Sequence, residues 1–508
     1  MASVGFPRKT LKETLVDSGS LLLIVLFVLA VGGVFATVGM SVKARDFAVI
    51  LGGFLVFLAA FASGNPRLYC FWGLILTIPL NLSKRFGPMF VGKPGGEDSF
   101  KLEVSDVFLI AMAGFLLIDI ITQRRKGLRI PKVTFLWVLL IAVGCVWVVV
   151  GQWQMSAAHE VVRMIKVMIL FLIIANELDR PSRIWHCAFG LLLVGIAESA
   201  IALAQYRMKG LLGLEILGET TNTAIDVMGS TSVQGQSVFR PSGLLQHPNL
   251  LGMYLALLLP LALGLLMVSK RPVSRIFFLL TLIVGAPTLI ITLSRSSWVA
   301  ATISVSLLLT LTLFRSRLRP RSLSVISLAG LLGVVILGAF FGPITDRLLR
   351  SKEDATTARE IWKADARSII EAAPLFGHGL NSYSYVVRDY STLRIETYAS
   401  PLLIVHHIFY LWWAETGIVG LLLFCSVWGS IIWTALGNLS VRDEMLFVVN
   451  AACLSGMVAL IPDGFLSFTL RVNQPLRMFW LEAGMIMAIR YLRLQEKANA
   501  TLEPAHNG

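Results

Sequence analysis

The sequence predicts an all-α, polytopic integral membrane protein with about fourteen transmembrane helices, and no fewer than twelve. Hydrophobic residues make up 56% of the 508 positions, charged residues only 15%, and the mean hydropathy is +0.76. So few charges cannot cover a folded chain with a water-compatible surface. Apolar runs recur between charged or Pro/Gly breaks, and a helix of ~20 apolar residues crosses a hydrocarbon core ~30 Å thick.

The apolar runs give the order of the predicted helices. The first run follows a short basic lead and is too long for a cleaved signal sequence, so we expect it to remain as the first span. The fourteen predicted spans are 19–40, 46–63, 68–83, 104–121, 133–151, 161–176, 184–206, 249–268, 276–292, 297–314, 323–342, 408–434, 445–461 and 477–492.

Basic residues punctuate the apolar segments instead of forming one patch. The net charge of +14 therefore indicates membrane topology and not a nucleic-acid partner. Short loops rich in Lys and Arg face the cytoplasm, and here they are 124–132, 270–275 and 315–321. This rule places both termini in the cytoplasm and sends two long segments, 207–248 and 343–407, to the outer side. We expect the second to hold short helices.

Several kinds of chemistry lack their usual sequence signals. The five cysteines are odd in number and show no metal-type spacing, so neither a disulfide framework nor a zinc site is predicted. There is no Gly-x-x-x-x-Gly-Lys-Ser/Thr loop for ATP and no Asp-x-Asp cluster for a divalent metal beside a nucleotide sugar. We expect a metal-independent reaction on an already activated donor, without a cofactor.

Three arginines lie where helices meet the predicted outer segments. Arg295 sits in a very tight connection between two spans, Arg240 precedes the His247-Pro248-Asn249 sequence, and Arg359 begins a charged helical stretch. A guanidinium suits a diphosphate because its planar donors engage two oxygens at once. The alternatives are an arginine that reaches the lipid headgroups, for Arg295, and pairing with carboxylates, for Arg240 and Arg359.

Two adjacent histidines, His406 and His407, close the second long segment and lead directly into the next span. An imidazole titrates near neutral pH, so one at this place can take the proton of an acceptor hydroxyl as that hydroxyl attacks a sugar carbon. The alternative is a hydrogen-bonded histidine that only spaces the loop from the membrane.

Other polar residues in or beside the spans are supporting candidates. Arg163 and Lys166 lie three apart on one helix face, and Glu198 is in the following helix. Charges inside a membrane need partners, so these residues either pair between neighbouring helices or line a substrate cavity. The supporting set is completed by His247, Asn249 and Asp463, the last between the final two spans.

Taken together, these motifs resemble the O-antigen ligase and polymerase superfamily, bacterial membrane proteins that move glycans from undecaprenyl diphosphate. The resemblance covers about residues 190–435, and the preceding spans match only generically. In the family the pair at the end of the long loop is commonly His-Asn, which aligns the general base with His406 and puts His407 in place of the amide. The matching stretches are Arg240-Pro-Ser-Gly-Leu-Leu-Gln-His247-Pro248-Asn249, Ser294-Arg295-Ser-Ser-Trp, Ala373-Pro374-Leu-Phe-Gly377-His-Gly379-Leu-Asn381 and His406-His407-Ile-Phe-Tyr-Leu-Trp-Trp-Ala-Glu415-Thr416-Gly417.

The resemblance implies a GT-C-like fold and a metal- and nucleotide-independent glycosyl transfer at the periplasmic face of the bacterial inner membrane. Arg295, Arg359 and Arg240 would hold the diphosphate, and His406 would activate the acceptor hydroxyl for attack at the anomeric carbon, with inversion. The implied partners are an undecaprenyl-diphosphate-linked glycan, an acceptor glycan or lipid A core, the bilayer and polysaccharide-assembly proteins.

The same interpretation divides the chain into a cytoplasmic lead, two sets of spans around a ligase-like core, and a tail. The core contains the two long outer segments. The five parts are 1–18 (lead), 19–206 (N-terminal spans), 207–435 (ligase-like core), 436–492 (C-terminal spans) and 493–508 (cytoplasmic tail).

The motifs do not separate a ligase, which uses lipid A core as the acceptor, from a polymerase, which extends a lipid-linked chain. The number of predicted spans exceeds the roughly twelve expected of a family ligase and favours polymerase or exopolysaccharide-type transfer. A secondary transporter or flippase is the alternative from another class. It would favour inverted repeats and helices broken at the membrane midplane, whereas the polar residues here concentrate in the two long outer segments.

Overall fold

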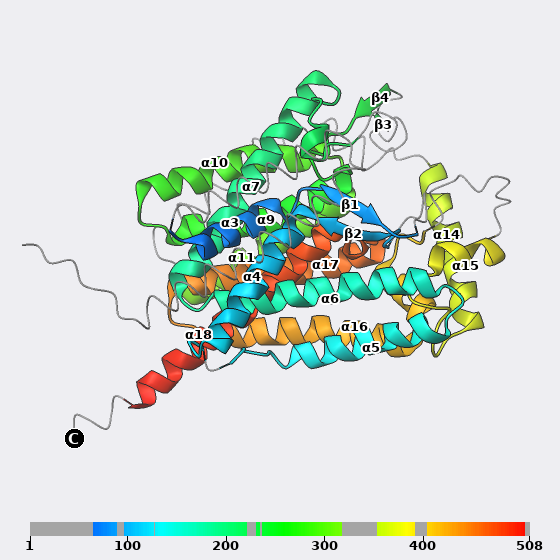
Figure 1. The fold of residues 1–508 in the computed structure, drawn as a ribbon. Helices are drawn as coiled ribbons and strands as arrows, with labels where there is room; N and C mark the ends of the chain where they lie inside the picture. Colours follow the sequence, from blue (N-terminus) through cyan, green and yellow to red (C-terminus); the bar gives the residue numbers. More distant parts are fainter. Residues whose placement is uncertain are drawn as a thin grey trace, which may run out of the picture. The chain divides into compact units, whose positions relative to one another are not determined.

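The computed structural model describes residues 64–88, 96–125, 127–220, 230–233, 236–316, 353–391 and 404–502. The chain divides into two compact units, Met1–Pro66 and Arg67–Gly508, and nearly all of the described residues belong to the second. The structure is 76% helical, and its described part holds thirteen α-helices and two small antiparallel hairpins (Figure 1). The mostly helical fold is as predicted; the hairpins were not.

Eight helices in the described residues are long and apolar enough to cross a membrane. Their bounds agree with predicted spans to within a few residues, and they confirm a multi-pass membrane protein. These helices are α4 (Val104–Ile121), α5 (Val133–Val150), α7 (Pro181–Met208), α9 (Pro248–Val268), α10 (Pro272–Ile291), α11 (Arg295–Ser316), α16 (Ile408–Asn438) and α17 (Glu444–Leu466).

Two further long helices, α6 (Gln154–Glu177) and α18 (Asn473–Leu502), contain the predicted spans 161–176 and 477–492. Both carry several charged residues within their length, which sets them apart from the eight apolar helices. The predicted spans 19–40, 46–63 and 323–342 lie outside the described residues. The total of fourteen and the cytoplasmic position of the termini therefore stay predictions.

The predicted span 68–83 was wrong in its extent. Helix α3 runs only over Pro66–Thr77 and is followed by strand β1 (Ser83–Phe86). Pro79 explains the end, because proline lacks the backbone N–H and disfavours helical geometry in the residue before it. At ~1.5 Å per residue, a helix of this length reaches only ~18 Å.

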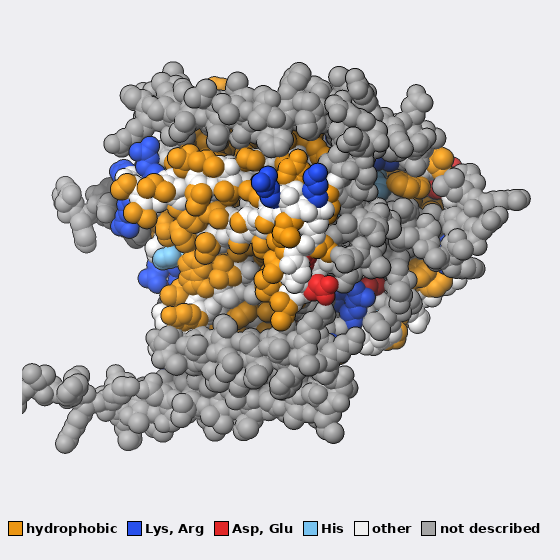
Figure 2. All heavy atoms as spheres, turned by 90° about the horizontal axis from the view of Figure 1, so that it is seen from above, with side chains coloured by type: hydrophobic (Ala, Val, Ile, Leu, Met, Phe, Trp, Pro, Cys, Tyr) orange, Lys and Arg blue, Asp and Glu red, His pale blue; other side chains and the backbone are white. Residues whose placement is uncertain are grey.

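Helix α9 is the central element of the described bundle. Of its apolar window, 94% is buried inside the protein, and it packs against α7, α10, α11, α17 and α18. Helix α6 packs against α4, α5 and α18, and α16 packs against α5, α17 and α18. Figure 2 shows hydrophobic side chains over much of the described surface in that view, as expected of a surface that faces lipid, with Lys and Arg side chains at its left end and a few near its middle and right.

The non-spanning elements gather toward one side in Figure 1. Strand β1 pairs with β2, and β3 pairs with β4, both antiparallel. The β3–β4 hairpin falls in the long segment 207–248, and two helices fall in 343–407: α15 is short, as expected, whereas α14 is longer than expected, with 20 residues. These elements are β2 (Phe100–Glu103), β3 (Ser230–Val233), β4 (Gln236–Phe239), α14 (Glu353–Ala372), α15 (Tyr383–Tyr390) and the 3-10 turns η1 (Glu215–Leu217) and η2 (Thr469–Arg471).

Helix α16 is broken at Gly417, whose φ of +66° and ψ of −173° lie outside the helical region. The segment 374–379 docks at this break through its backbone. Its close approach leaves no room for a side chain, because a Cβ on Gly417 would lie 2.1 Å from the Leu375 carbonyl oxygen. The docking hydrogen bonds run from His378 N to Ala414 O (3.0 Å), from Gly379 N to Glu415 O (2.8 Å) and from Ile418 N to Pro374 O (2.9 Å).

We predict that Gly417→Ala destabilises the protein, because alanine would be held in a backbone region essentially restricted to glycine, at a cost of ~1–3 kcal/mol, and would also clash with the docked segment. Gly429→Ala is the matched control: it lies in the same helix, and nothing is within 4 Å of its added Cβ. Thermal unfolding of the two purified variants in detergent checks this. Equal midpoints would show that the break in α16 is not needed for the fold.

Candidate functional site

The motif that begins at Arg240 is shaped by two buried side chains of α7. The side-chain oxygen of Gln205 accepts hydrogen bonds from Ser242 N (3.1 Å) and Gly243 N (2.9 Å). Glu198 accepts one from Leu244 N (2.8 Å). Gly243 has a φ of +59°, and a Cβ there would lie 2.3 Å from the Glu198 carboxylate. Glu198 therefore holds this loop, and does not pair with Arg163 or Lys166 as one alternative had it.

Arg240 braces the start of α9 against the turn between α10 and α11. Its Nε donates to the Thr292 carbonyl (2.7 Å), and its Nη2 donates to the Asn249 side chain (2.6 Å). His247 caps α9, because its Nδ1 accepts the Asn249 N–H (3.1 Å). The tight connection predicted around Arg295 is this turn, and Arg295 is the first residue of α11.

Arg359 of α14 lies close enough to Arg295 for the two charges to interact. Burial lowers the pKa of Arg359, and the positive charge of Arg295 lowers it further. In the described part of the chain, no hydrogen bond or ion pair reaches the Arg359 side chain. A half-buried guanidinium beside a second cation is favourable once an anion binds between them.

His406 contacts two aromatic rings, which we name the aromatic clamp. Trp362 of α14 stacks on the imidazole at 5.2 Å between ring centroids, and Phe468 contacts it at 5.0 Å. Burial, and then the charge of Arg359, lower the pKa of His406 to about 4. At neutral pH the imidazole is therefore uncharged and holds a lone pair that can accept a proton.

His407 has a different task, because it caps α16. Its Nδ1 accepts the Tyr410 N–H at 3.2 Å, and its ring stacks on the Tyr410 ring at 4.0 Å. Asparagine is among the best N-capping residues. Asn and His407 can therefore do the same task directly before the helix, which is to accept a backbone N–H at its start.

His247 interacts with both Arg240 and His406. Burial, then the charges of Arg240 and His406, lower the pKa of His247 to about 3. His247 thus interacts with Arg240 and His406, His406 with Arg359, and Arg359 with Arg295, so neighbouring pairs connect five predicted residues from four separate parts of the chain. We call them the arginine–histidine cluster: Arg240, His247, Arg295, Arg359 and His406.

Asp463 lies beside this cluster. It is buried in α17 near its end, and its carboxylate is in hydrogen-bonding contact with the hydroxyls of Ser296 and Thr469. Ser296 follows Arg295 directly. The other carboxylate oxygen, Oδ1, has no hydrogen-bonding partner within the described structure.

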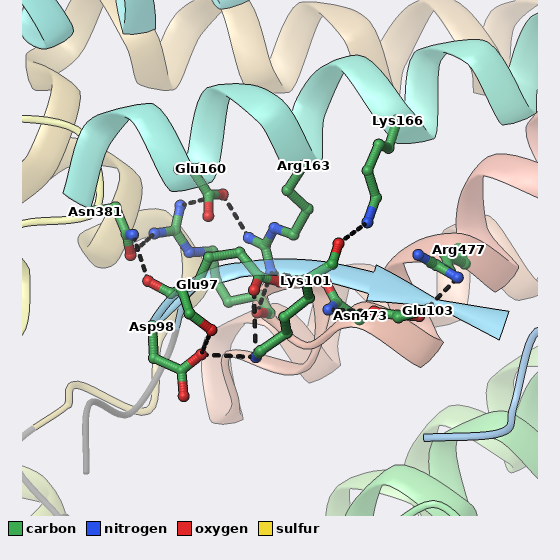
Figure 3. A network of polar contacts seen from close by, with 12 residues as sticks. Glu97, Asp98, Lys101, Glu103, Glu160, Arg163, Lys166, Asn381, Asn473 and Arg477 are labelled. Atoms are coloured by element: carbon green, nitrogen blue, oxygen red, sulfur yellow. Dashed lines mark hydrogen bonds and ion pairs between the residues drawn. The ribbon is translucent and has the colours of Figure 1, made fainter. Parts of the chain in front are cut away.

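Arg163 and Lys166 belong to a separate network of buried charges, shown in Figure 3. Arg163 pairs with Glu160 on its own helix, and its Nη1 donates to the Arg471 carbonyl (2.6 Å). Lys166 pairs with Asp106 at 2.6 Å. Of the two alternatives, these contacts agree with structural pairing of the charged residues. The structure does not bring Arg163 or Lys166 into the arginine–histidine cluster.

The sequence did not reveal the other members of this buried network. The charges of Arg163 and Lys166 in α6 indicated that partners exist. Glu160 is in the same helix, but most other members of the network come from strand β2, α4, α16, η2 and α18, which are distant in sequence. The members not predicted are Glu97, Asp98, Lys101, Glu103, Asp106, Glu160, Asn381, Glu415, Arg471, Asn473 and Arg477.

No group of three or more His, Cys, Asp or Glu side chains within the described ranges is placed to hold a metal ion. The five cysteines are all in the described part, and none forms a disulfide.

Residues 276–425 match the family model described as O-antigen ligase. The matched segment begins in α10 and ends in α16, so it contains Arg295, Arg359 and His406, while Arg240 precedes it and Asp463 follows it. No curated protein matches the chain. The match confirms the resemblance drawn from the motifs: residues 276–425, within a multi-pass membrane protein, are similar to the O-antigen ligase family.

Proposed function

We propose that this protein transfers a glycan from undecaprenyl diphosphate to an acceptor hydroxyl at the periplasmic face of the bacterial inner membrane. One observation carries the proposal: Arg359 lies within electrostatic reach of both Arg295 and His406. A pair of guanidinium groups beside a neutral imidazole provides an anion site and a proton acceptor in one place.

In the proposed reaction, His406 takes the proton of the acceptor hydroxyl as its oxygen attacks the anomeric carbon. The bond from that carbon to the diphosphate oxygen breaks at the same time, and the configuration inverts. Charge develops on the departing diphosphate, and preorganised cations stabilise it most in the transition state. Arg295 and Arg359 supply these cations, and no metal ion is required.

We assign Arg240 a supporting role, because two of its nitrogens are already bonded to Thr292 and Asn249. These bonds fix the turn from which Arg295 projects. His247 and Asn249 serve the same purpose as capping and bracing groups. Asp463 contacts the residue next to Arg295, so it supports the same turn from α17.

A transporter would also contain a broken helix, and α16 is broken. In transporters, the freed backbone groups at such a break coordinate the substrate or ion. Here the freed groups at Ala414, Glu415 and Ile418 are bonded by the segment 374–379 of the same chain. The break is filled by protein, which favours the enzyme over the transporter.

The acceptor is either lipid A core or a second lipid-linked repeat unit. The preference for a polymerase depended on the total number of spans, and three of those predicted spans lie outside the described residues. Both acceptors present a sugar hydroxyl, so the same base and the same diphosphate site serve either reaction.

We predict that His406→Ala lowers glycan transfer by ~10²–10⁴-fold, the usual contribution of a general base. His407→Asn should retain activity, because asparagine also caps a helix. Transfer is measured on membranes from cells lacking the native copy, alongside protein abundance and the amount of lipid-linked precursor at the outer face. Loss of the exported precursor in His406→Ala would favour a transporter, and activity at the level of the unmodified protein would remove the proposed base.

The pH profile tests the same residue. The pKa of His406 is lowered from 6.5 to about 4, so the base stays deprotonated, and kcat/KM holds, until the pH approaches that value. Below it the imidazole gains a proton and activity falls. Arg359→Gln should raise the pKa of His406 and so shift this acidic limb to higher pH. The shift should be smaller than the whole difference between 6.5 and about 4, because burial lowers this pKa more than Arg359 does.

Arg367→Gln is the matched control, since Arg367 is an exposed residue of the same helix. It should leave both the limb and the rate unchanged. An acidic limb that stays in place in Arg359→Gln would show that Arg359 does not act on His406.

A further inference from the structure

The connection between α17 and α18 forms one wall of the site. Phe468 in this connection is one half of the aromatic clamp around His406. The preceding residue, Ser467, accepts a backbone hydrogen bond from Ile408 (3.1 Å), the first residue of α16. The position of this connection therefore sets where the imidazole of His406 lies.

Arg471 anchors this connection from the inside. Its side chain is 1% exposed, and it pairs with Glu415 at 2.9 Å and with Glu160 at 3.3 Å. Its backbone N–H donates to the Phe468 carbonyl (2.7 Å), which closes the turn η2. Its own carbonyl accepts from Arg163 at 2.6 Å. The backbone and the side chain of Arg471 are thus both fixed.

Glu415 extends the same anchor to the other half of the clamp. Its carboxylate accepts hydrogen bonds from Asn381 N (2.9 Å) and Tyr383 N (3.3 Å). These residues close the segment that follows α14, the helix that carries Trp362. One ion pair thus fixes the two segments that bring Trp362 and Phe468 into contact with His406.

Stability alone gives a weak reason for such a pair. Buried ion pairs can often be replaced by well-packed apolar residues without loss of stability, and their best-attested value is in fixing one geometry. The position of His406 is such a geometry, because a misplacement of ~1 Å at a reacting group can lower the rate ~10²-fold.

We propose that the Glu415–Arg471 ion pair is a positioning device for His406, acting through the aromatic clamp. Arg471 lies outside the segment matched by the O-antigen ligase model, and its role rests on the proposed function of His406 as the base. Neither residue touches the reacting atoms in this proposal; both act through Trp362 and Phe468.

The test compares Arg471→Gln with Arg477→Gln in the full-length protein in detergent. Arg477 is a matched control, because it is buried in the same network but pairs with Glu103 and Asp106 and does not contact η2. The first readout is the rate at which diethyl pyrocarbonate modifies His406, followed by peptide mass spectrometry, with the exposed His186 as internal reference. The second is kcat and KM for glycan transfer.

We expect Arg471→Gln to make modification of His406 several-fold faster and to lower kcat by ~10²-fold with a smaller change in KM. Arg471→Lys should restore part of both, and Arg477→Gln should change neither. Equal modification of His406 in the two glutamine variants would overturn the proposal. Faster modification with normal transfer would uphold the positioning and refute His406 as the base.

Phe468→Ala is the second variant, for the case that Arg471→Gln does not fold. It removes one half of the clamp and leaves the ion pair intact. It should also speed the modification of His406 and lower kcat, whereas Phe468→Leu should change both less. Modification of His406 at the unmodified rate in Phe468→Ala would exclude the clamp as the means of positioning.

Discussion

The carboxylate of Glu415 is the group on which the arrangement of the site depends. A charge in an apolar bundle is tolerated only when its hydrogen-bonding partners are in place. Those partners are two backbone N–H groups at the start of α15 and the guanidinium of Arg471. The segment after α14, the break in α16 and the turn η2 therefore have to assemble together, since leaving any one out exposes an unpaired buried charge.

Two kinds of buried cation are found in this protein, and their surroundings distinguish them. Arg163, Lys166 and Arg471 each contact a carboxylate, so their charge is balanced within the fold. Arg359 instead faces Arg295, and its pKa is lowered by burial and by that second positive charge. A cation paired with a carboxylate stabilises one packing of helices, whereas two adjacent guanidinium groups attract an anion, and the second arrangement fits the proposed diphosphate site.

The sequence predicted the helices well because span length and hydrophobicity are local properties. The predicted bounds of α4 were those observed, and α9 began one residue earlier than predicted. The prediction failed at 68–83, where Pro79 ends a helix inside an apolar run, and at the β1–β2 and β3–β4 hairpins, which form outside the spans. In the site, motifs predicted Arg295, Arg359 and His406. They could not predict that Arg163 would bond to Arg471, 308 residues away, because an isolated charge does not specify its partner.

The structure also explains how adjacent histidines come to differ. In a neutral imidazole one nitrogen donates and the other accepts. The Nδ1 atoms of His247 and His407 already accept backbone N–H groups at helix starts, so their Nε2 atoms carry the proton and neither ring has a free acceptor. His406 precedes the cap, and its ring is held by aromatic contacts alone within the described residues. Unlike a cap, these ring contacts do not use a ring nitrogen as a hydrogen-bond acceptor, so a nitrogen lone pair is left for the proposed acceptor hydroxyl. The position before the cap is therefore the one that suits a base.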